Sequence, residues 1–120
     1  MDLGVVTEQV HGGWMVEVSG EVDLHTAPQL RAALESAVSA AGDADGAAVL
    51  VDLSDVGFMD STGLGELVGA HRALERSGSQ LHLAVGNERV ARLLSITGLD
   101  EVLPTHPDRA SGLAVLAATD

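Results

Sequence analysis

Two adjacent hydroxyls and a carboxylate stand at Asp60-Ser61-Thr62, where an apolar stretch ends and a helical pattern begins. Hydroxyls at the start of a helix lie beside unpaired backbone N–H groups and the positive end of the helix dipole. Because such a corner favours negative charge, it can accommodate a phosphate on Ser61. The alternative is that Ser61 or Thr62 only caps the helix, which is a common use of both residue types.

Three glycines fall in the first turns of the same predicted helix, at Gly63, Gly65 and Gly69. Each costs about 1 kcal/mol relative to alanine in a helix interior. Their number indicates that something approaches this backbone closely, either the sheet behind it or a partner in front of it.

A second polar corner, Gly20-Glu21-Val22-Asp23, follows a strand pattern and precedes the next helix. Most acidic runs of this kind are solvated turns. If the sheet is parallel at its centre, however, this corner lies beside the Ser61 corner, because both follow strands that lead into helices. The ends of such strands are the usual place for binding sites in open α/β sheets.

Other kinds of chemistry find little support in the residue pattern. The five histidines lie in separate elements without metal-ligand spacing, so no metal site is expected. Ser61 is not in a Gly-x-Ser-x-Gly elbow, and no histidine has the context of its base, so a serine hydrolase is only a minor alternative. Residues Asp60-Ser61-Thr62-Gly63 are similar to the Asp-Ser/Thr-Gly motif of aspartic proteases, but an extra residue separates the aspartate from the glycine. The chain also has no second copy of the motif, so an aspartic protease is rejected.

Length and charge limit the function further. The chain has 120 residues, and we expect a single domain over residues 1–120. Its net charge of −12 argues against direct contact with nucleic acid or an anionic membrane. There is no cysteine, no signal-type segment and no apolar run near the ~20 residues of a membrane span. These features predict a soluble cytoplasmic protein, and nothing in them calls for a cofactor.

Hydrophobic periodicity predicts alternating strands and helices after an initial hairpin that turns at Gly12-Gly13. Thr26 and Gln29 have the spacing of a capping box before the first helix. The expected strands are residues 5–10, 14–18, 47–53 and 81–85, with a short edge strand at 102–103. The expected helices are residues 30–41, 64–74, 90–94 and 113–117, the last begun by Asp108. This order predicts an α/β fold with a mixed, mostly parallel sheet and helices packed against it.

Two stretches of the chain resemble a known family. Residues Gly20-Glu21-Val22-Asp23-Leu24-His25-Thr26-Ala27-Pro28-Gln29-Leu30 resemble the first signature of STAS domains of the anti-sigma factor antagonist type. Val51-Asp52-Leu53-Ser54 through Phe58-Met59-Asp60-Ser61-Thr62-Gly63-Leu64-Gly65 resembles the second, which contains the phosphorylated serine. The order and spacing of the two match the family, and the resemblance covers nearly the whole chain.

This resemblance implies a STAS-like sheet of four or five strands with an N-terminal antiparallel hairpin and helices mainly on one side. It implies no enzymatic activity. The unphosphorylated form would bind an anti-sigma factor that is a GHKL-type serine kinase. Once bound, this anti-sigma factor would release its sigma factor. Phosphorylation at Ser61 would end this binding, and a serine phosphatase would restore it. The residues implied in partner binding are Asp23, His25, Thr26, Asp60, Ser61, Thr62, Gly63, Leu64 and Gly65.

A different member of the same family is the main alternative. In that case the chain is a STAS scaffold or accessory subunit of a stress-signalling or lipid-transport complex, and Ser61 is never modified. The intact Asp60-Ser61 pair favours the antagonist.

Overall fold

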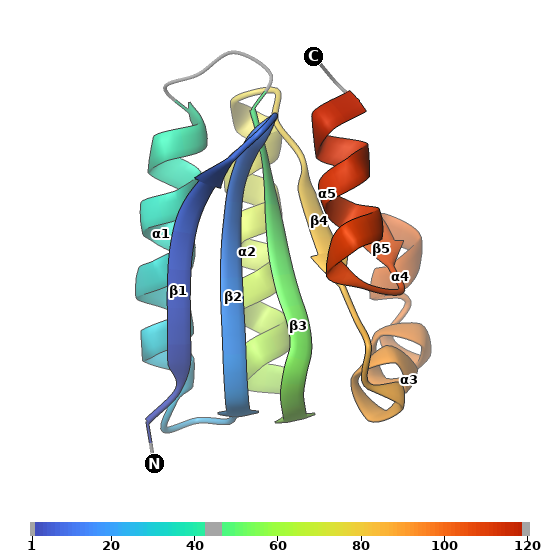
Figure 1. The fold of residues 1–120 in the computed structure, drawn as a ribbon. Coiled ribbons are helices and arrows are strands. Elements are labelled where there is room, and N and C mark those ends of the chain that lie inside the picture. Colours follow the sequence, from blue (N-terminus) through green and yellow to red (C-terminus); the bar gives the residue numbers. More distant parts are fainter. Residues whose placement is uncertain (1, 43–46, 119–120) are drawn as a thin grey trace.

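The computed structural model describes residues 2–42 and 47–118, and within them five strands form one sheet in the order β1-β2-β3-β4-β5 (Figure 1). The strands are β1 (Gly4–Val10), β2 (Gly13–Val22), β3 (Ala48–Met59), β4 (Leu81–Ala84) and β5 (Thr105–His106). The helices are α1 (Ala27–Gly42), α2 (Ser61–Arg76), α3 (Glu88–Thr97), α4 (Leu99–Val102) and α5 (Arg109–Ala118). The predicted α/β class is confirmed.

The sheet is antiparallel only at its beginning. Strands β1 and β2 form the predicted hairpin, which turns at Gly12 with a left-handed φ of 88°. From β2 onwards each strand is parallel to the next one, β2 to β3, β3 to β4 and β4 to β5. Because the carboxyl ends of parallel strands meet at one edge, the segments that follow β2, β3 and β4 all begin on the same side of the molecule.

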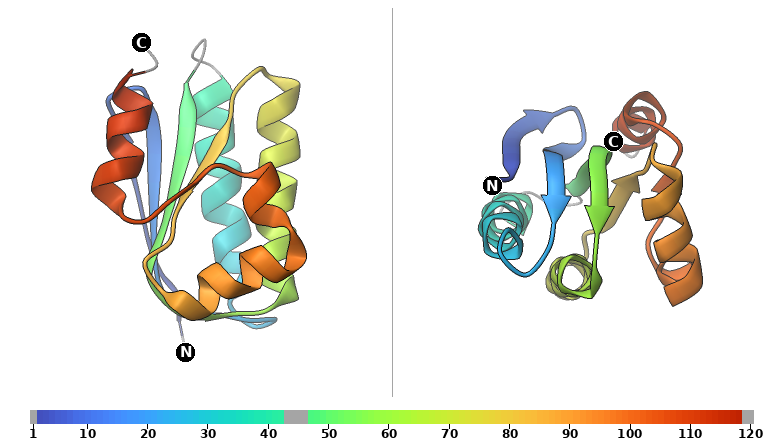
Figure 2. Two further views of the ribbon diagram at one scale, coloured as in Figure 1. Left: turned by 90° about the vertical axis from the view of Figure 1, so that its right-hand side faces the viewer. Right: turned by 90° about the horizontal axis from the view of Figure 1, so that it is seen from below.

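Helices α1 and α2 cover one face of the sheet, as the view from below shows (Figure 2). Their apolar stripes pack on strand residues such as Val16, Val51 and Leu83, each fully buried. The prediction of helices mainly on one side is confirmed, and helix α5 departs from the majority. It lies on the opposite face, where Leu116 packs with Leu50 and other small and apolar side chains of the sheet.

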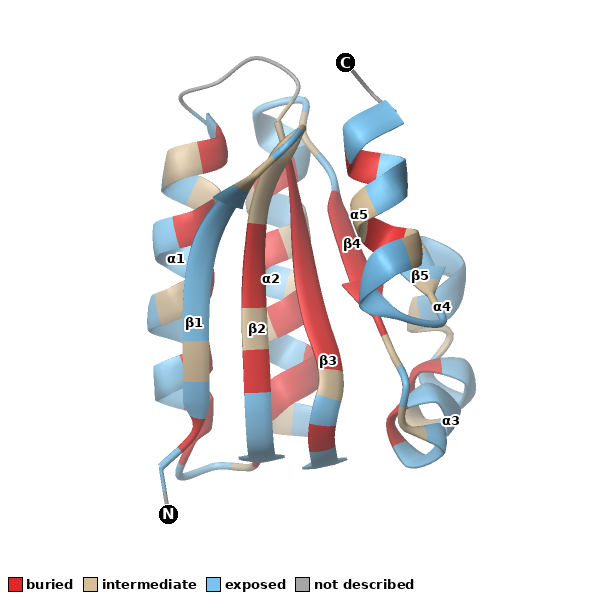
Figure 3. Cartoon of the chain, viewed as in Figure 1, coloured by how far each residue is buried: buried red, intermediate tan, exposed pale blue. Residues whose placement is uncertain are grey.

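The covering of both faces buries the centre of the sheet. The strand predicted at residues 81–85 is β4, all of whose residues are buried although its sequence alternates, and most of β3 is buried as well (Figure 3). On the α5 side His82 is 4% exposed, and its Nδ1 lies 3.0 Å from Nε2 of His106. Burial and the neighbouring His106 lower the pKa of His82, which favours its neutral form.

The predicted edge strand at residues 102–103 is wrong, although an edge strand exists nearby. Val102 ends α4, and Leu103 is buried in the main core. The parallel pairing with β4 is made by Thr105 and His106. Tertiary packing of Leu103 therefore displaces the strand towards the C-terminus.

The predicted start of α5 at Asp108 is confirmed, because its Oδ1 accepts a hydrogen bond of 2.7 Å from the Ser111 N–H.

An ion-paired cluster fastens the start of α5 to the sheet. Asp52 on β3 is 3% exposed, and its Oδ2 accepts a hydrogen bond of 2.6 Å from Nε of Arg109. Arg109 also pairs with Glu17 on β2, at 2.7 Å. Burial opposes ionisation of Asp52, but hydrogen bonds from Ser54 and Arg109 outweigh it, so the pKa of Asp52 lies below its ordinary value.

We expect Asp52→Asn to lower the free energy of unfolding at pH 7 by about 1–3 kcal/mol, because it removes a charge-assisted hydrogen bond. Because the pKa of Asp52 is lower in the folded state than in the unfolded state, its ionised carboxylate stabilises the fold at pH values above the unfolded-state pKa, near 3.9. This stabilisation is lost as the pH falls through the folded-state pKa. The difference between variant and wild type should therefore shrink between pH 7 and about pH 3. Urea unfolding across this range measures it, with Asp100→Asn on the surface as control. A difference that stays constant down to pH 3 would contradict this account.

Candidate functional site

The two polar corners lie side by side at the carboxyl edge of the sheet, as expected. Val22 at the end of β2 pairs with Met59 at the end of β3. The backbone N–H of Asp60 also donates a hydrogen bond of 3.1 Å to the carbonyl of Val22. The segment after β2 and the start of α2 are thereby joined through the sheet itself.

The start of α2 is capped by Asp60. Asp60 has an extended backbone, and its Oδ1 accepts a hydrogen bond of 2.9 Å from the Thr62 N–H. The interpretation of Ser61 or Thr62 as the cap is therefore wrong. Ser61 is the first residue of the helix, it is exposed, and its hydroxyl makes no hydrogen bond within residues 2–42 and 47–118. The carboxylate does the capping, which leaves the Ser61 hydroxyl available.

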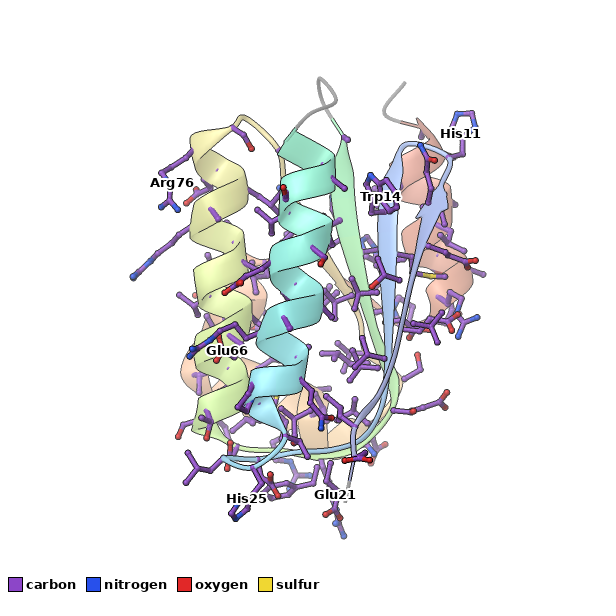
Figure 4. All side chains as sticks on the ribbon, turned by 90° about the vertical axis from the view of Figure 1, so that its left-hand side faces the viewer. His11, Trp14, Glu21, His25, Glu66 and Arg76 are labelled. Atoms are coloured by element: carbon purple, nitrogen blue, oxygen red, sulfur yellow. The ribbon has the colours of Figure 1, made fainter. Side chains whose placement is uncertain are left out.

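Asp23 organises the neighbouring segment in a similar way. Its Oδ1 accepts hydrogen bonds from the N–H groups of His25, at 2.9 Å, and Thr26, at 3.0 Å. These bonds, that from Thr26 foremost, lower the pKa of Asp23 and favour its charged form. His25 is exposed beside the acidic side chain of Glu21, at the end of the molecule where α2 begins (Figure 4).

The predicted capping box of Thr26 and Gln29 does not form. The Thr26 hydroxyl donates to the carbonyl of Glu21 at 2.7 Å and accepts from the Asp23 N–H at 3.0 Å. Gln29 instead accepts a hydrogen bond of 2.7 Å from the Leu3 N–H. Thr26 is therefore a buried support of the loop rather than a surface residue.

The glycines of α2 fall into two kinds. A Cβ on Gly63 would lie 2.6 Å from Cγ1 of Val22 and 2.9 Å from Cγ of Met59, so the sheet behind requires this glycine. A Cβ on Gly65 would meet nothing within 4 Å. Gly65 is exposed, whereas Leu64 is 7% exposed and belongs to the core.

The structure thus divides the nine predicted site residues. Thr26, Gly63 and Leu64 are buried and support the corner from within. The remaining six, which are at least partly exposed, are Asp23, His25, Asp60, Ser61, Thr62 and Gly65.

Sequence reasoning missed two exposed apolar side chains at the same edge. Leu24, between Asp23 and His25, is 70% exposed, and Phe58, which pairs with Glu21 across the strands, is 46% exposed. Large apolar side chains gathered on a surface mark interaction sites. The available signal was the position of each residue within two places of a site aspartate, Leu24 after Asp23 and Phe58 before Asp60.

The described residues offer neither a metal site nor a membrane-spanning helix. Within residues 2–42 and 47–118, no three metal-ligating side chains are grouped closely enough to hold an ion. No helix in the same ranges is long and apolar enough to cross a membrane.

Comparison with known proteins identifies the family. The model of the STAS domain matches residues 5–112, and the chain belongs to this family. It is 36% identical over 113 residues to the anti-sigma-B factor antagonist of Bacillus subtilis (strain 168), covering 94% of this chain and 99% of that relative. It is 41% identical over 86 residues to the protein of the same name from Listeria monocytogenes, covering 72% of each.

A solved structure agrees with this assignment. The crystal structure of an anti-sigma factor antagonist from Mycobacterium paratuberculosis superposes with a TM-score of 0.84 at 29% identity, covering 95% of this chain and 93% of that one. The family suggested by the two sequence signatures is therefore confirmed.

The capping geometry separates two roles of Asp60. Asp60→Ala should lower the free energy of unfolding by about 1 kcal/mol, because the Thr62 N–H loses its acceptor. Asp60→Asn keeps a side-chain oxygen for the cap and should change stability by less than about 0.5 kcal/mol. Urea unfolding of the two variants at pH 7 makes the comparison. Equal losses in both would show that the charge of Asp60, rather than its acceptor oxygen, stabilises the helix.

Proposed function

We propose that this chain is an anti-sigma factor antagonist controlled by phosphorylation. Its unphosphorylated form binds an anti-sigma factor that is also a GHKL-type serine kinase, and the bound kinase releases its sigma factor. The observation that carries the proposal is the exposed Ser61 hydroxyl, without a hydrogen-bond partner among the described residues, at the first position of α2. The antagonist names of the relatives in this family support the same role.

The electrostatics of the corner suit a switch. Phosphorylation adds about −1.5 to −2 charges, next to Asp60 in a chain whose net charge is already −12. The backbone N–H groups at the start of α2 stabilise part of this charge, so the fold survives. A partner surface closed over Ser61 has no such compensation. An unpaired buried charge costs several kcal/mol, and each 1.4 kcal/mol is about tenfold in affinity.

The partners follow from this mechanism. The kinase phosphorylates Ser61, and a separate serine phosphatase removes the phosphate. The acidic surface favours protein partners over nucleic acid, and all of these encounters take place in the cytoplasm. The chain itself catalyses nothing in this scheme, because the kinase and the phosphatase carry out both reactions.

A STAS scaffold without a phosphoswitch is the second candidate, and the same experiments distinguish it. Every GHKL-type serine kinase of the source genome is purified and titrated against the unmodified chain. Tight binding by one of them supports the antagonist, and binding by none of them supports the scaffold.

We expect the kinase that binds to transfer one phosphate from ATP to Ser61. Mass spectrometry after incubation locates the phosphate, and Ser61→Ala should remain unlabelled while Thr62→Val is still labelled. Labelling of Thr62 in the wild type, or equal labelling of Ser61→Ala, would show that Ser61 is not the acceptor.

Ser61→Asp should weaken kinase binding, whereas Ser61→Ala should preserve it. The aspartate places a charge where the helix dipole tolerates it but where the partner has to bury it. An aspartate carries less charge than a phosphate, so we expect a loss of about tenfold rather than complete loss. Calorimetric titration with the kinase compares both variants with authentic phospho-Ser61. Equal affinities for wild type, Ser61→Asp and phospho-Ser61 would rule out the switch.

A further inference from the structure

A groove between α1 and α2 lies on the outer side of these helices, away from the sheet. It has a volume of about 380 Å³. Its lining contains Leu34 and Val38 from α1 and Gly69, Ala70 and Ala73 from α2. Most of this lining is apolar, and nothing in the described chain fills it.

Two of the glycines of α2 have no internal explanation. A Cβ on Gly65 or on Gly69 would meet nothing within 4 Å, in contrast to Gly63. Alanine at either position would make α2 more stable without a clash. The fold therefore gains nothing from the missing side chains, whereas a partner gains close access to the helix backbone.

A row of small residues on α2 leads from the proposed site to the groove. Ser61, Gly65, Gly69 and Ala73 follow one another at intervals of four residues, so each is the neighbour of the one before it along a row that winds slowly around α2. Gly69 and Ala73 of this row line the groove. A segment that covers Ser61 can continue along the bare backbone of α2 and enter the groove.

The charges at the rim indicate what kind of segment fits. Arg31 on α1 is paired with Glu66 on α2, with Nη2 to Oε2 at 2.9 Å, and Glu66 lies on the side of α2 that faces α1 (Figure 4). Glu35 adds a second carboxylate to the rim. With Arg31 already neutralised, the rim carries net negative charge. An apolar floor with an acidic rim is complementary to an amphipathic helix that has basic residues on its flanks.

We propose that this groove binds a basic amphipathic helix of the same anti-sigma kinase that docks over Ser61. The inference rests on the proposed function and extends the contact surface from the start of α2 to about the level of Ala73. Small residues at Gly65 and Gly69 let the two helices approach closely, as small residues do at other helix interfaces.

The test fills the groove without damaging the fold. Gly69→Leu should raise the melting temperature by about 3 °C, because leucine is a better helix former and its Cβ is unobstructed. The same variant should bind the kinase at least about tenfold more weakly than wild type, as expected when a central contact is blocked. Ala114→Leu, an exposed position of α5 on the other face of the sheet, is the control and should bind within about twofold of wild type.

A second measurement does not depend on the variant. Cross-saturation from the bound kinase to methyl groups of the wild-type chain should reach Val38 and Ala73. Transfer confined to residues near Ser61, or unchanged affinity of Gly69→Leu, would overturn the groove proposal while leaving the antagonist function intact. If no kinase binds the wild type, both proposals fail. If the chain alone forms a dimer that Gly69→Leu abolishes, the occupant is a second copy, and the kinase helix is wrong.

Discussion

The parallel pairing of β2 with β3 is the constraint on which the site depends. It places Val22 opposite Met59, and the Asp60 N–H completes the contact by donating to the Val22 carbonyl. Two segments far apart in the sequence are thereby held at one edge. If the register of β3 shifted by one residue, its side chains would exchange faces. Val51 would leave the core under α1 and α2, and Asp52 would lose Arg109, so these contacts fix the position of Ser61 indirectly.

Within this frame, carboxylates carry the structural roles at the corner. Asp60 caps α2 and Asp23 holds the segment before α1, each by accepting backbone hydrogen bonds. Because the aspartates accept the backbone hydrogen bonds, the Ser61 hydroxyl stays exposed at the positive end of a helix. The same arrangement that keeps the helix start intact makes it a place where one covalent change alters the charge of the surface without unfolding the protein.

The predictable part of the fold was the part governed by local patterns. The hairpin at Gly12-Gly13, the apolar first half of β3 and the starts of α2 and α5 follow from turn chemistry, burial and capping residues, whereas the extension of β3 to Met59 was not predicted. Where the expectations failed, a distant contact decided the outcome. Residue Gln29 bonds to Leu3 instead of completing a capping box, and Leu103 packs into the core instead of joining the sheet edge.

The sequence by itself determined the family, the order of the elements and the position of Ser61 at a helix start, because motif spacing and periodicity are local properties of the chain. Only the tertiary structure decided which glycines serve the fold, since Gly63 faces Val22 across the sheet while Gly65 and Gly69 face open space. It also decided that α5 covers the second face, held by the ion pair of the exposed Arg109 with the buried Asp52. These two residues are 57 positions apart, and their contact depends on long-range packing that no local pattern encodes.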